Sequence, residues 1–145
     1  MRLDSVFPKR VVTATAETHV SAIADMMDEE GVGTVVVVDE NEKPIGIVTD
    51  RDMAIELGSG RVIRSEAARV IMSRPLATIG CHEGILAATR RMCDNAVRRL
   101  PIVDDNGKLV GLISEDDLLM LLGREIGNLV GCVRQEIGTA KFSRG

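Results

Sequence analysis

The chain has 145 residues, a formal net charge of −4, a hydrophobic content of 45% and a charged content of 28%, which is ordinary for a folded domain and argues against disorder. This length can bury one sizeable core, or two small cores that share an interface. The acidic balance, with a pI near 5.2, argues against nucleic acid as a partner because a phosphate backbone requires a basic surface.

No apolar run approaches the roughly 20 residues that a membrane-spanning helix needs, so no membrane partner is expected. Residues 1–10 mix charges with Pro8 and lack the apolar core of a signal peptide. Cys81, Cys93 and Cys132 form an odd set without metal-site spacing, which predicts small buried thiols in a reducing compartment. We therefore expect a cytoplasmic protein without a bound metal.

The first half of the chain predicts an alternation of strands and helices. Gly31 is well placed to end a helix in the left-handed conformation. The four valines at 35–38 predict a strand that is covered on both faces, and the polar cluster at 39–42 predicts a turn. The expected elements are a strand at 11–13, a helix over 18–30, strands at 35–38 and 44–49, and a helix from Asp50.

The second half repeats the first. When the sequence is shifted by 65 positions, residues 11–58 align with residues 76–123 without a gap. Two copies are too few for a solenoid, in which about three or more units stack, and they favour a pseudo-twofold pair that buries one face between its halves. The second copy predicts a strand at 76–78, a return strand at 108–114 and a helix from Glu115. Identical pairs include Thr13/Thr78, Asp39/Asp104, Gly46/Gly111, Asp52/Asp117 and Gly58/Gly123.

Two segments lie outside the repeated pattern. Gly58-Ser59-Gly60 predicts a flexible joint, and the stretch 65–68 could cap a short connecting helix. Residues 124–137 have apolar side chains at helical spacing, which predicts an amphipathic helix that needs a partner surface, either its own module or a second chain. The predicted organisation is a first repeat at 6–58, a linker at 59–69, a second repeat at 70–123 and a C-terminal helix at 124–137.

One motif recurs where a strand runs into a helix: Gly-Ile-Val-Thr-Asp-Arg-Asp at 46–52 and Gly-Leu-Ile-Ser-Glu-Asp-Asp at 111–117. The free amides of a helix N-terminus and the helix dipole favour an anion there. The hydroxyl group can donate to a phosphate or ribose oxygen, and the carboxylate three residues later can accept hydrogen bonds from a ribose diol.

The same spacing has a purely structural interpretation. Thr49 with Asp52, and Ser114 with Asp117, both match a capping box, in which the hydroxyl and the carboxylate satisfy amides of their own helix. Duplication would copy a cap as readily as a binding site, so the spacing leaves both interpretations open.

These motifs, together with the stretch 31–39 ahead of the first motif and 97–104 ahead of the second, resemble the cystathionine-beta-synthase (CBS) domain, twice over. The resemblance covers nearly the whole chain. It implies an α+β fold of two β-α-β-β-α repeats related by pseudo-twofold symmetry, followed here by the C-terminal amphipathic helix. It also implies two clefts between the repeats, which in many relatives hold AMP, ADP, ATP or S-adenosylmethionine.

The resemblance also implies which residues would bind a nucleotide. The ribose-binding acids would be Asp52 and Asp117, the strand-end hydroxyls Thr49 and Ser114, and the polar residues of the first strands Thr13 and Thr78. Phosphate-binding basic residues would be Arg98 and Arg99, whose counterparts in the first copy are Gly33 and Thr34, so the first copy departs from the basic pattern.

The charges predict that the two clefts differ. Arg51 lies on the first turn of its helix, where holding an anion would rationalise a cation. The second copy has three consecutive carboxylates at 115–117, which would repel a phosphate unless Arg98 or Arg99 offsets them. Neighbours on a strand point to opposite faces, so only one arginine is expected to face a given cleft. The alternative for both arginines is a solvated surface pair.

The leading hypothesis is a regulatory module that binds an adenine nucleotide of the AMP, ADP or ATP class, with S-adenosylmethionine less favoured and no obligatory cofactor. No catalytic constellation is recognisable, so no enzymatic activity is expected. The alternative is a ligand-free dimerisation or interaction scaffold with vestigial clefts. In either case we expect a homodimer and a protein effector that the sequence does not identify.

Overall fold

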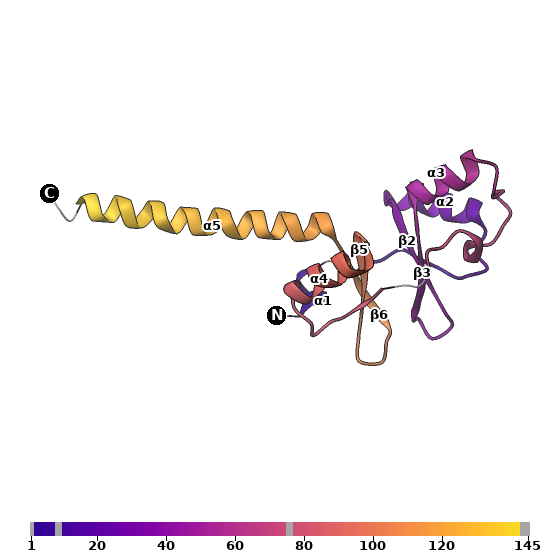
Figure 1. Cartoon of the computed structure of the whole chain (residues 1–145), viewed down its shortest axis with the longest axis horizontal. Helices are drawn as coiled ribbons and strands as arrows, with labels where there is room; N and C mark the ends of the chain where they lie inside the picture. Colours follow the sequence, from indigo (N-terminus) through magenta and orange to yellow (C-terminus); the bar gives the residue numbers. More distant parts are fainter. Residues whose placement is uncertain (1, 8–9, 75–76, 143–145) are drawn as a thin grey trace. The chain divides into compact units, whose positions relative to one another are not determined.

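The computed structural model describes residues 2–7, 10–74 and 77–142. It divides into two compact units, Met1–Ile113 and Ser114–Gly145. The first unit contains both three-stranded sheets apart from the last residue of one strand, and the second unit is essentially one helix, labelled α5 in Figure 1. The fold is α+β, as predicted.

The first repeat has the predicted element order. Its three strands form a sheet in the order β1-β2-β3, in which β1 is parallel to β2 and β2 is antiparallel to β3. Helices α2 and α3 contact each other and pack against this sheet (Figure 1). The elements are β1 (Thr13–Ala14), α2 (Val20–Glu30), β2 (Thr34–Val38), β3 (Pro44–Thr49) and α3 (Asp50–Gly58).

The valine run forms the central strand β2, and its first three valines are completely buried, as expected for a strand covered on both faces. Gly31 ends α2 with φ 63° and ψ 38°, a left-handed conformation that glycine adopts without a steric cost. Both predictions are confirmed.

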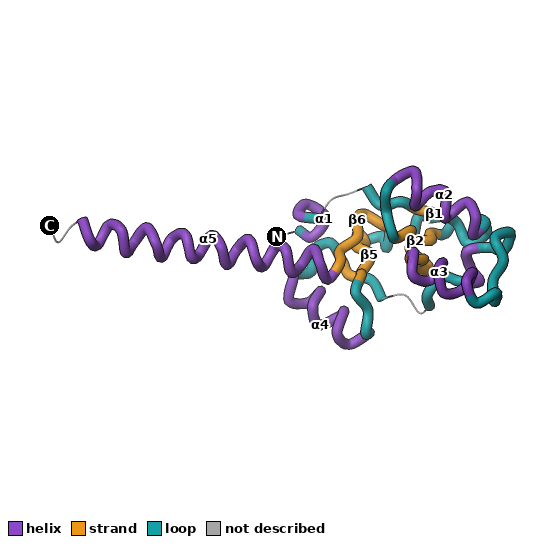
Figure 2. The backbone as a smooth tube through the Cα atoms, turned by 90° about the horizontal axis from the view of Figure 1, so that it is seen from above, coloured by secondary structure: helices purple, strands orange, loops and turns teal. Residues whose placement is uncertain are grey.

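The second repeat follows a short connection that contains a 3-10 helix, η1 (Ala68–Val70). The expected cap at 65–68 is wrong in detail, because Ala67 is the N-cap of η1 and it offers no side-chain acceptor. The strand expected at 76–78 begins later, and its first residue, Leu76, lies outside the described residues. The elements are β4 (Ile79–Gly80), α4 (Ile85–Asn95), β5 (Arg99–Val103) and β6 (Leu109–Ser114), with the strands in the order β4-β5-β6. Helix α4 and strands β5 and β6 are labelled in Figure 2.

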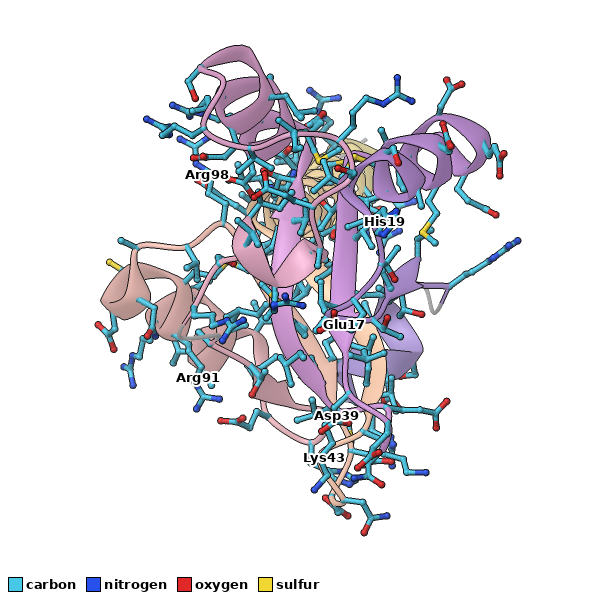
Figure 3. All side chains as sticks on the ribbon, turned by 90° about the vertical axis from the view of Figure 1, so that its right-hand side faces the viewer. Glu17, His19, Asp39, Lys43, Arg91 and Arg98 are labelled. Carbon is cyan, nitrogen blue, oxygen red and sulfur yellow. The ribbon has the colours of Figure 1, made fainter. Side chains whose placement is uncertain are left out.

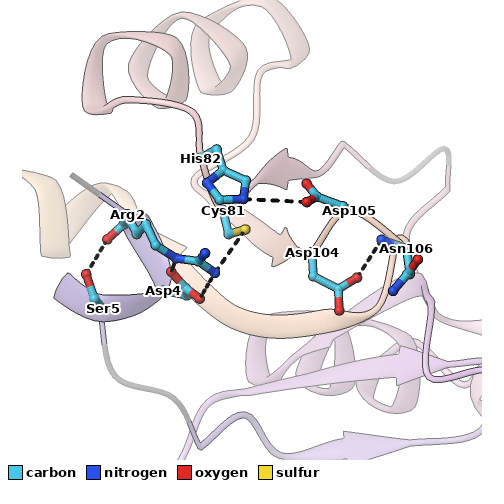
Figure 4. Close-up of polar contacts among 8 residues, drawn as sticks. All are labelled: Arg2, Asp4, Ser5, Cys81, His82, Asp104, Asp105 and Asn106. Atoms are coloured by element: carbon cyan, nitrogen blue, oxygen red, sulfur yellow. Dashed lines mark hydrogen bonds and ion pairs between the residues drawn. The ribbon is translucent and has the colours of Figure 1, made fainter.

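The first residues of the chain pack against the second repeat. In α1 (Leu3–Val6) the side chain of Leu3 is fully buried, and its amide donates to the Cys81 carbonyl at 2.9 Å. The Arg2 guanidinium pairs with Asp4 and contacts the Cys81 sulfur at 3.5 Å (Figure 4). Cys81 is buried as predicted, whereas Cys93 and Cys132 are exposed. Cys93 occupies the position of Asp28 in the first copy, where an exposed side chain is expected, so only Cys132 departs from the prediction.

The C-terminal segment corrects another expectation. The last helix of the second repeat and the predicted tail helix are a single helix, α5 (Glu115–Phe142). Gly123 does not interrupt it, because this glycine does not adopt the positive φ that ends α2. In the described part of the chain, neither α5 nor any other helix combines the length and apolar character that crossing a bilayer requires.

Candidate functional site

A cleft of about 340 Å³ lies between the two repeats, within the first compact unit. The first repeat contributes the end of β3 and the first turn of α3. The connection between the repeats contributes two residues, and the second repeat contributes the turn from α4 into β5. The lining residues are Ile47, Thr49, Asp52, Ser73, Ala77, Ala96, Val97, Arg98 and Arg99.

The junction between β3 and α3 is held by a capping box. The Thr49 hydroxyl accepts a hydrogen bond from the Asp52 amide at 3.2 Å, and Asp52 Oδ2 accepts one from the Thr49 amide at 2.9 Å. Both side chains are half-buried and line the cleft. A carboxylate has two oxygens and about four lone-pair sites, so the capping bond through Oδ2 leaves acceptor capacity on Oδ1.

The equivalent junction in the second compact unit has the same geometry. The Ser114 hydroxyl accepts from the Asp117 amide at 3.1 Å, and Asp117 Oδ2 accepts from the Ser114 amide at 2.9 Å. The structural interpretation of the repeated motif is therefore realised in both copies. In the first copy, the hydroxyl and the carboxylate also line the cleft.

The turn after α4 brings the basic residues to the cleft. Ala96 adopts a left-handed conformation with φ 52° and ψ 42°, and the Val97 amide donates back to the Met92 carbonyl at 3.0 Å, which closes the helix end as a Schellman motif. The chain then reverses into β5 through Arg98, which is labelled in Figure 3.

Both arginines line the cleft, which corrects the expectation that only one would. Strand alternation does not apply to the pair, because β5 begins at Arg99 and Arg98 still belongs to the turn. Arg98 is exposed and Arg99 is half-buried. In the sequence, the two arginines belong to the same repeat as the carboxylates at 115–117. In the cleft, they lie with Thr49 and Asp52 of the first repeat.

The connection between the repeats forms another wall of the cleft. The Ser73 amide and hydroxyl both donate to the Ile47 carbonyl, at 2.9 and 3.2 Å. The preceding residues of the two segments, Met72 and Gly46, are also in close contact. A β-carbon on Gly46 would come within 2.6 Å of the Met72 sulfur. The close approach that glycine permits thus places the connection against β3 beside the cleft.

Four other predicted residues are not among the lining residues in the described part of the chain. Thr13 is exposed on β1, Thr34 is buried on β2, and Arg51 is exposed on the first turn of α3. Thr78 lies next to the lining residue Ala77, and its carbonyl accepts a hydrogen bond from Arg91 at 2.9 Å.

Arg91, which is labelled in Figure 3, also forms an ion pair with Glu83. Its guanidinium contacts both oxygens of Glu83, at 2.8 and 2.9 Å, and the Gly80 amide donates to Glu83 Oε2 at 2.7 Å. The amide of Gly80, followed by the guanidinium, lowers the pKa of the Glu83 carboxyl. This pair ties α4 to the start of its own sheet.

Sequence reasoning missed five of the lining residues. Val97 directly precedes the two arginines, and Ile47 lies inside the repeated motif, so proximity to predicted residues could have indicated both. Ala77, the counterpart of Val12 in the repeat, directly precedes Thr78 and could have been indicated in the same way. Ser73 belongs to a connection without a repeated counterpart, and the sequence carries no signal for it. The fifth is Ala96.

Comparison with protein families agrees with this architecture. The family model described as CBS domain matches twice, at residues 4–59 and 67–124. The two matches together span most of the chain, and each contains one set of the strands and helices described above.

Curated relatives include an uncharacterized protein of Methanopyrus kandleri, 42% identical over 112 residues, or 77% of this chain and 57% of the relative. A homoserine O-acetyltransferase of Methanococcoides burtonii is 30% identical over 118 residues, or 81% of this chain and 23% of the enzyme. The matched segment therefore covers less than two thirds of both relatives, and it is a minor part of the enzyme.

Solved structures share the fold. The CBS domain pair of protein MJ0100, in complex with 5-methylthioadenosine and S-adenosyl-L-methionine, has a TM-score of 0.75 at 23% identity over 86% of this chain and 98% of its own. The CBS domain protein PAE2072 from Pyrobaculum aerophilum, complexed with AMP, has a TM-score of 0.73 at 21% identity over 86% of this chain and 99% of its own.

Proposed function

The chain belongs to the CBS domain family, and from that membership we propose that it is a regulatory module that binds an anionic adenine nucleotide in the cleft between its repeats. The observation that carries the proposal is the convergence of two arginines, a carboxylate and a hydroxyl on one cleft. These groups come from two different repeats.

The cleft chemistry suits a nucleotide in each of its parts. Arg98 and Arg99 offer planar guanidinium groups that match phosphate oxygens. Asp52 Oδ1 can accept from the ribose diol while Oδ2 remains in the capping box. Ile47 and Val97 supply apolar surface for a base, and a volume of about 340 Å³ falls within the usual range of small-molecule sites, about 300–1,000 Å³.

The net charge of the lining favours a phosphate-bearing ligand. It contains two guanidinium groups and one carboxylate. AMP, ADP and ATP are anionic, whereas S-adenosylmethionine carries a cationic sulfonium group that the arginines would repel. We therefore place AMP, ADP or ATP ahead of S-adenosylmethionine, although a structural relative is complexed with the latter.

Binding would act as a signal by joining elements that are distant in sequence. A nucleotide that contacts Asp52 on α3 and Arg99 on β5 stabilises the arrangement of the two repeats in which both contacts form, and it shifts the population toward that arrangement. A protein effector would respond to this change. The described lining offers no paired general acid and base for a reaction, so the proposed role is sensing without catalysis. The proposed location is the cytoplasm.

Titration calorimetry tests the proposal with AMP, ATP and S-adenosylmethionine on the wild-type chain, Arg99→Ala and Arg51→Ala. Loss of a charge-assisted hydrogen bond costs about 1.5–3 kcal/mol, so Arg99→Ala should weaken nucleotide binding roughly 10- to 150-fold. Arg51→Ala is the matched control, because it removes the same charge from an exposed residue outside the lining.

A smaller loss of binding is expected for that control, because Arg51 is exposed and does not line the cleft. Absence of heat with all three ligands would refute the proposal. Equal losses in both variants would show that general electrostatic attraction, rather than this cleft, binds the nucleotide.

A second candidate function is a ligand-free scaffold. The observation that favours it is the capping box, which already engages Thr49 and one oxygen of Asp52. Thermal unfolding separates the two candidates, because a ligand at 100 times its dissociation constant stabilises a protein by about 2.7 kcal/mol. An unchanged melting temperature in millimolar nucleotide would favour the scaffold.

A further inference from the structure

Helix α5 carries an unpartnered apolar stripe along most of its length. Seven large apolar residues recur every three or four positions, the spacing at which side chains share one helix face and pack against another helix. Each of them is at least 44% exposed. They are Leu119, Leu122, Ile126, Leu129, Val130, Val133 and Ile137.

The rest of α5 makes it a poor helix in isolation. Gly123, Gly127, Gly131 and Gly138 lie within it, and a β-carbon on any of them would meet no neighbouring atom within 4 Å. These glycines therefore permit no close contact within the chain, and each lowers the intrinsic helix propensity relative to alanine. Tertiary or quaternary packing of the apolar face is the usual source of stability for such a helix.

The charge along the segment indicates what covers the stripe. Residues 115–125 contain four carboxylates and one arginine, a net charge of −3, whereas the rest of α5, residues 126–142, contains one arginine and one lysine against one glutamate, a net charge of +1. An antiparallel copy of the same helix would place the acidic half of each chain beside the basic half of the other. A parallel copy would place like charges together.

The stripe itself is compatible with a copy of itself. It extends from Leu119 to Ile137, so in an antiparallel pair centred near residue 128 every apolar residue lies opposite the stripe of its partner. A twofold axis makes such an interface self-complementary. Glu136 continues the three-and-four spacing after Leu129 and Val133. In a parallel pair, its carboxylate would therefore face the same carboxylate of the second chain.

We propose that α5 is the homodimerisation element of this protein and that it pairs antiparallel with α5 of a second copy. This proposal is independent of nucleotide binding. It concerns the second compact unit, whereas the cleft lies entirely within the first.

Sedimentation of the full chain over a range of concentrations tests the interface. Leu129→Glu should weaken dimerisation about 30-fold or more, the usual effect of losing a central apolar anchor. The control is Asn128→Glu, which adds the same charge one residue away, on an exposed position outside the stripe. A monomer at all concentrations, or a dimer that Leu129→Glu leaves intact, would overturn the proposal.

Disulfide cross-linking tests the orientation in a background with the two exposed cysteines, Cys93 and Cys132, replaced by serine. Leu119→Cys mixed with Ile137→Cys should cross-link on oxidation, whereas either variant alone should stay uncross-linked. These positions are 18 residues apart in α5, or about 27 Å along a helix. Efficient cross-linking of Leu119→Cys to itself would overturn the antiparallel arrangement.

Discussion

Replacement of Gly46 by alanine should disturb the wall of the cleft, whereas the same change at Gly111, its counterpart in the second repeat, should be tolerated. A β-carbon on Gly46 would lie 2.6 Å from Met72 Sδ, 2.8 Å from its Cγ and 2.9 Å from its Cβ. A change of side-chain rotamer can move the sulfur and Cγ, but Cβ moves only with the backbone.

That backbone is held on both sides. The Met72 amide donates to the Ala68 carbonyl at 2.9 Å, and the Ser73 amide donates to the Ile47 carbonyl at 2.9 Å. Overpacking a tight site costs about 1–3 kcal/mol, and replacing a strand glycine with alanine returns about 0.5–1 kcal/mol. Because the clash includes Met72 Cβ, which only a backbone shift relieves, the cost lies in the upper part of its range, about 2–3 kcal/mol. The net loss for Gly46→Ala is therefore about 1–2 kcal/mol.

At Gly111 the nearest atom to an added β-carbon is Ile102 Cδ1, at 3.2 Å. This atom is the end of a flexible side chain and can shift by a few tenths of an ångström. The cost of contact is then smaller than the gain of about 0.5–1 kcal/mol from removing a strand glycine. Gly111→Ala should therefore be neutral or slightly stabilising.

Guanidinium unfolding followed by far-ultraviolet circular dichroism measures both variants, since the chain has no tryptophan to report by fluorescence. Gly46→Ala should lower the free energy of unfolding, and a loss of 1–2 kcal/mol corresponds to a melting temperature lower by about 2–8 °C. If the cleft binds a nucleotide, this variant should also weaken binding, because Met72 and Ser73 must move away from β3. Equal stability of the two variants would refute the packing argument.

Two further predictions concern the helix junctions and pH. Thr49→Ala and Ser114→Ala each remove the hydroxyl that accepts a hydrogen bond from a helix amide. Each should lower the free energy of unfolding by about 1 kcal/mol in the same denaturation assay. A loss of stability in only one of the two variants would contradict the conclusion that the two caps are equivalent. Glu83 has a pKa below 4.5 because Gly80 and Arg91 stabilise its charged form. Its contribution to stability is present above that value and is lost as the pH falls through the lowered pKa. The melting temperature of Glu83→Gln should therefore fall less than that of the wild type between pH 6 and pH 3, and parallel curves would argue against this role.

The order of elements could be predicted because each local signal agreed with the others. A buried valine run, a left-handed glycine at position 31 and a repeat offset of 65 residues all indicate the same β-α-β-β-α unit. The length of α5 could not be predicted, because Gly123 resembles a helix end in sequence. Whether a glycine ends a helix depends on its backbone conformation, which residue type alone does not determine.

The candidate site was harder to predict than the fold because it is assembled across the repeats. Thr49 and Asp52 are adjacent in sequence, so a motif indicates them, and Arg98 with Arg99 form an evident basic pair. No local pattern indicates that the two pairs face one cleft. Ser73 lies on that cleft only because Gly46 admits Met72 at close range, a tertiary packing effect that has no periodic signature.

The two repeats differ at the position equivalent to Arg98. This position in the first repeat is Gly33, whose carbonyl accepts from the Asp50 amide at 3.0 Å. A β-carbon there would come within 2.7 Å of Asp50 Oδ2, so a larger residue at position 33 requires the exposed Asp50 side chain to turn away, which breaks the hydrogen bond that Asp50 Oδ1 accepts from the Arg51 amide. The first repeat contributes its capped junction to the cleft, and the second repeat contributes Arg98 and Arg99. The cleft therefore combines groups from both repeats.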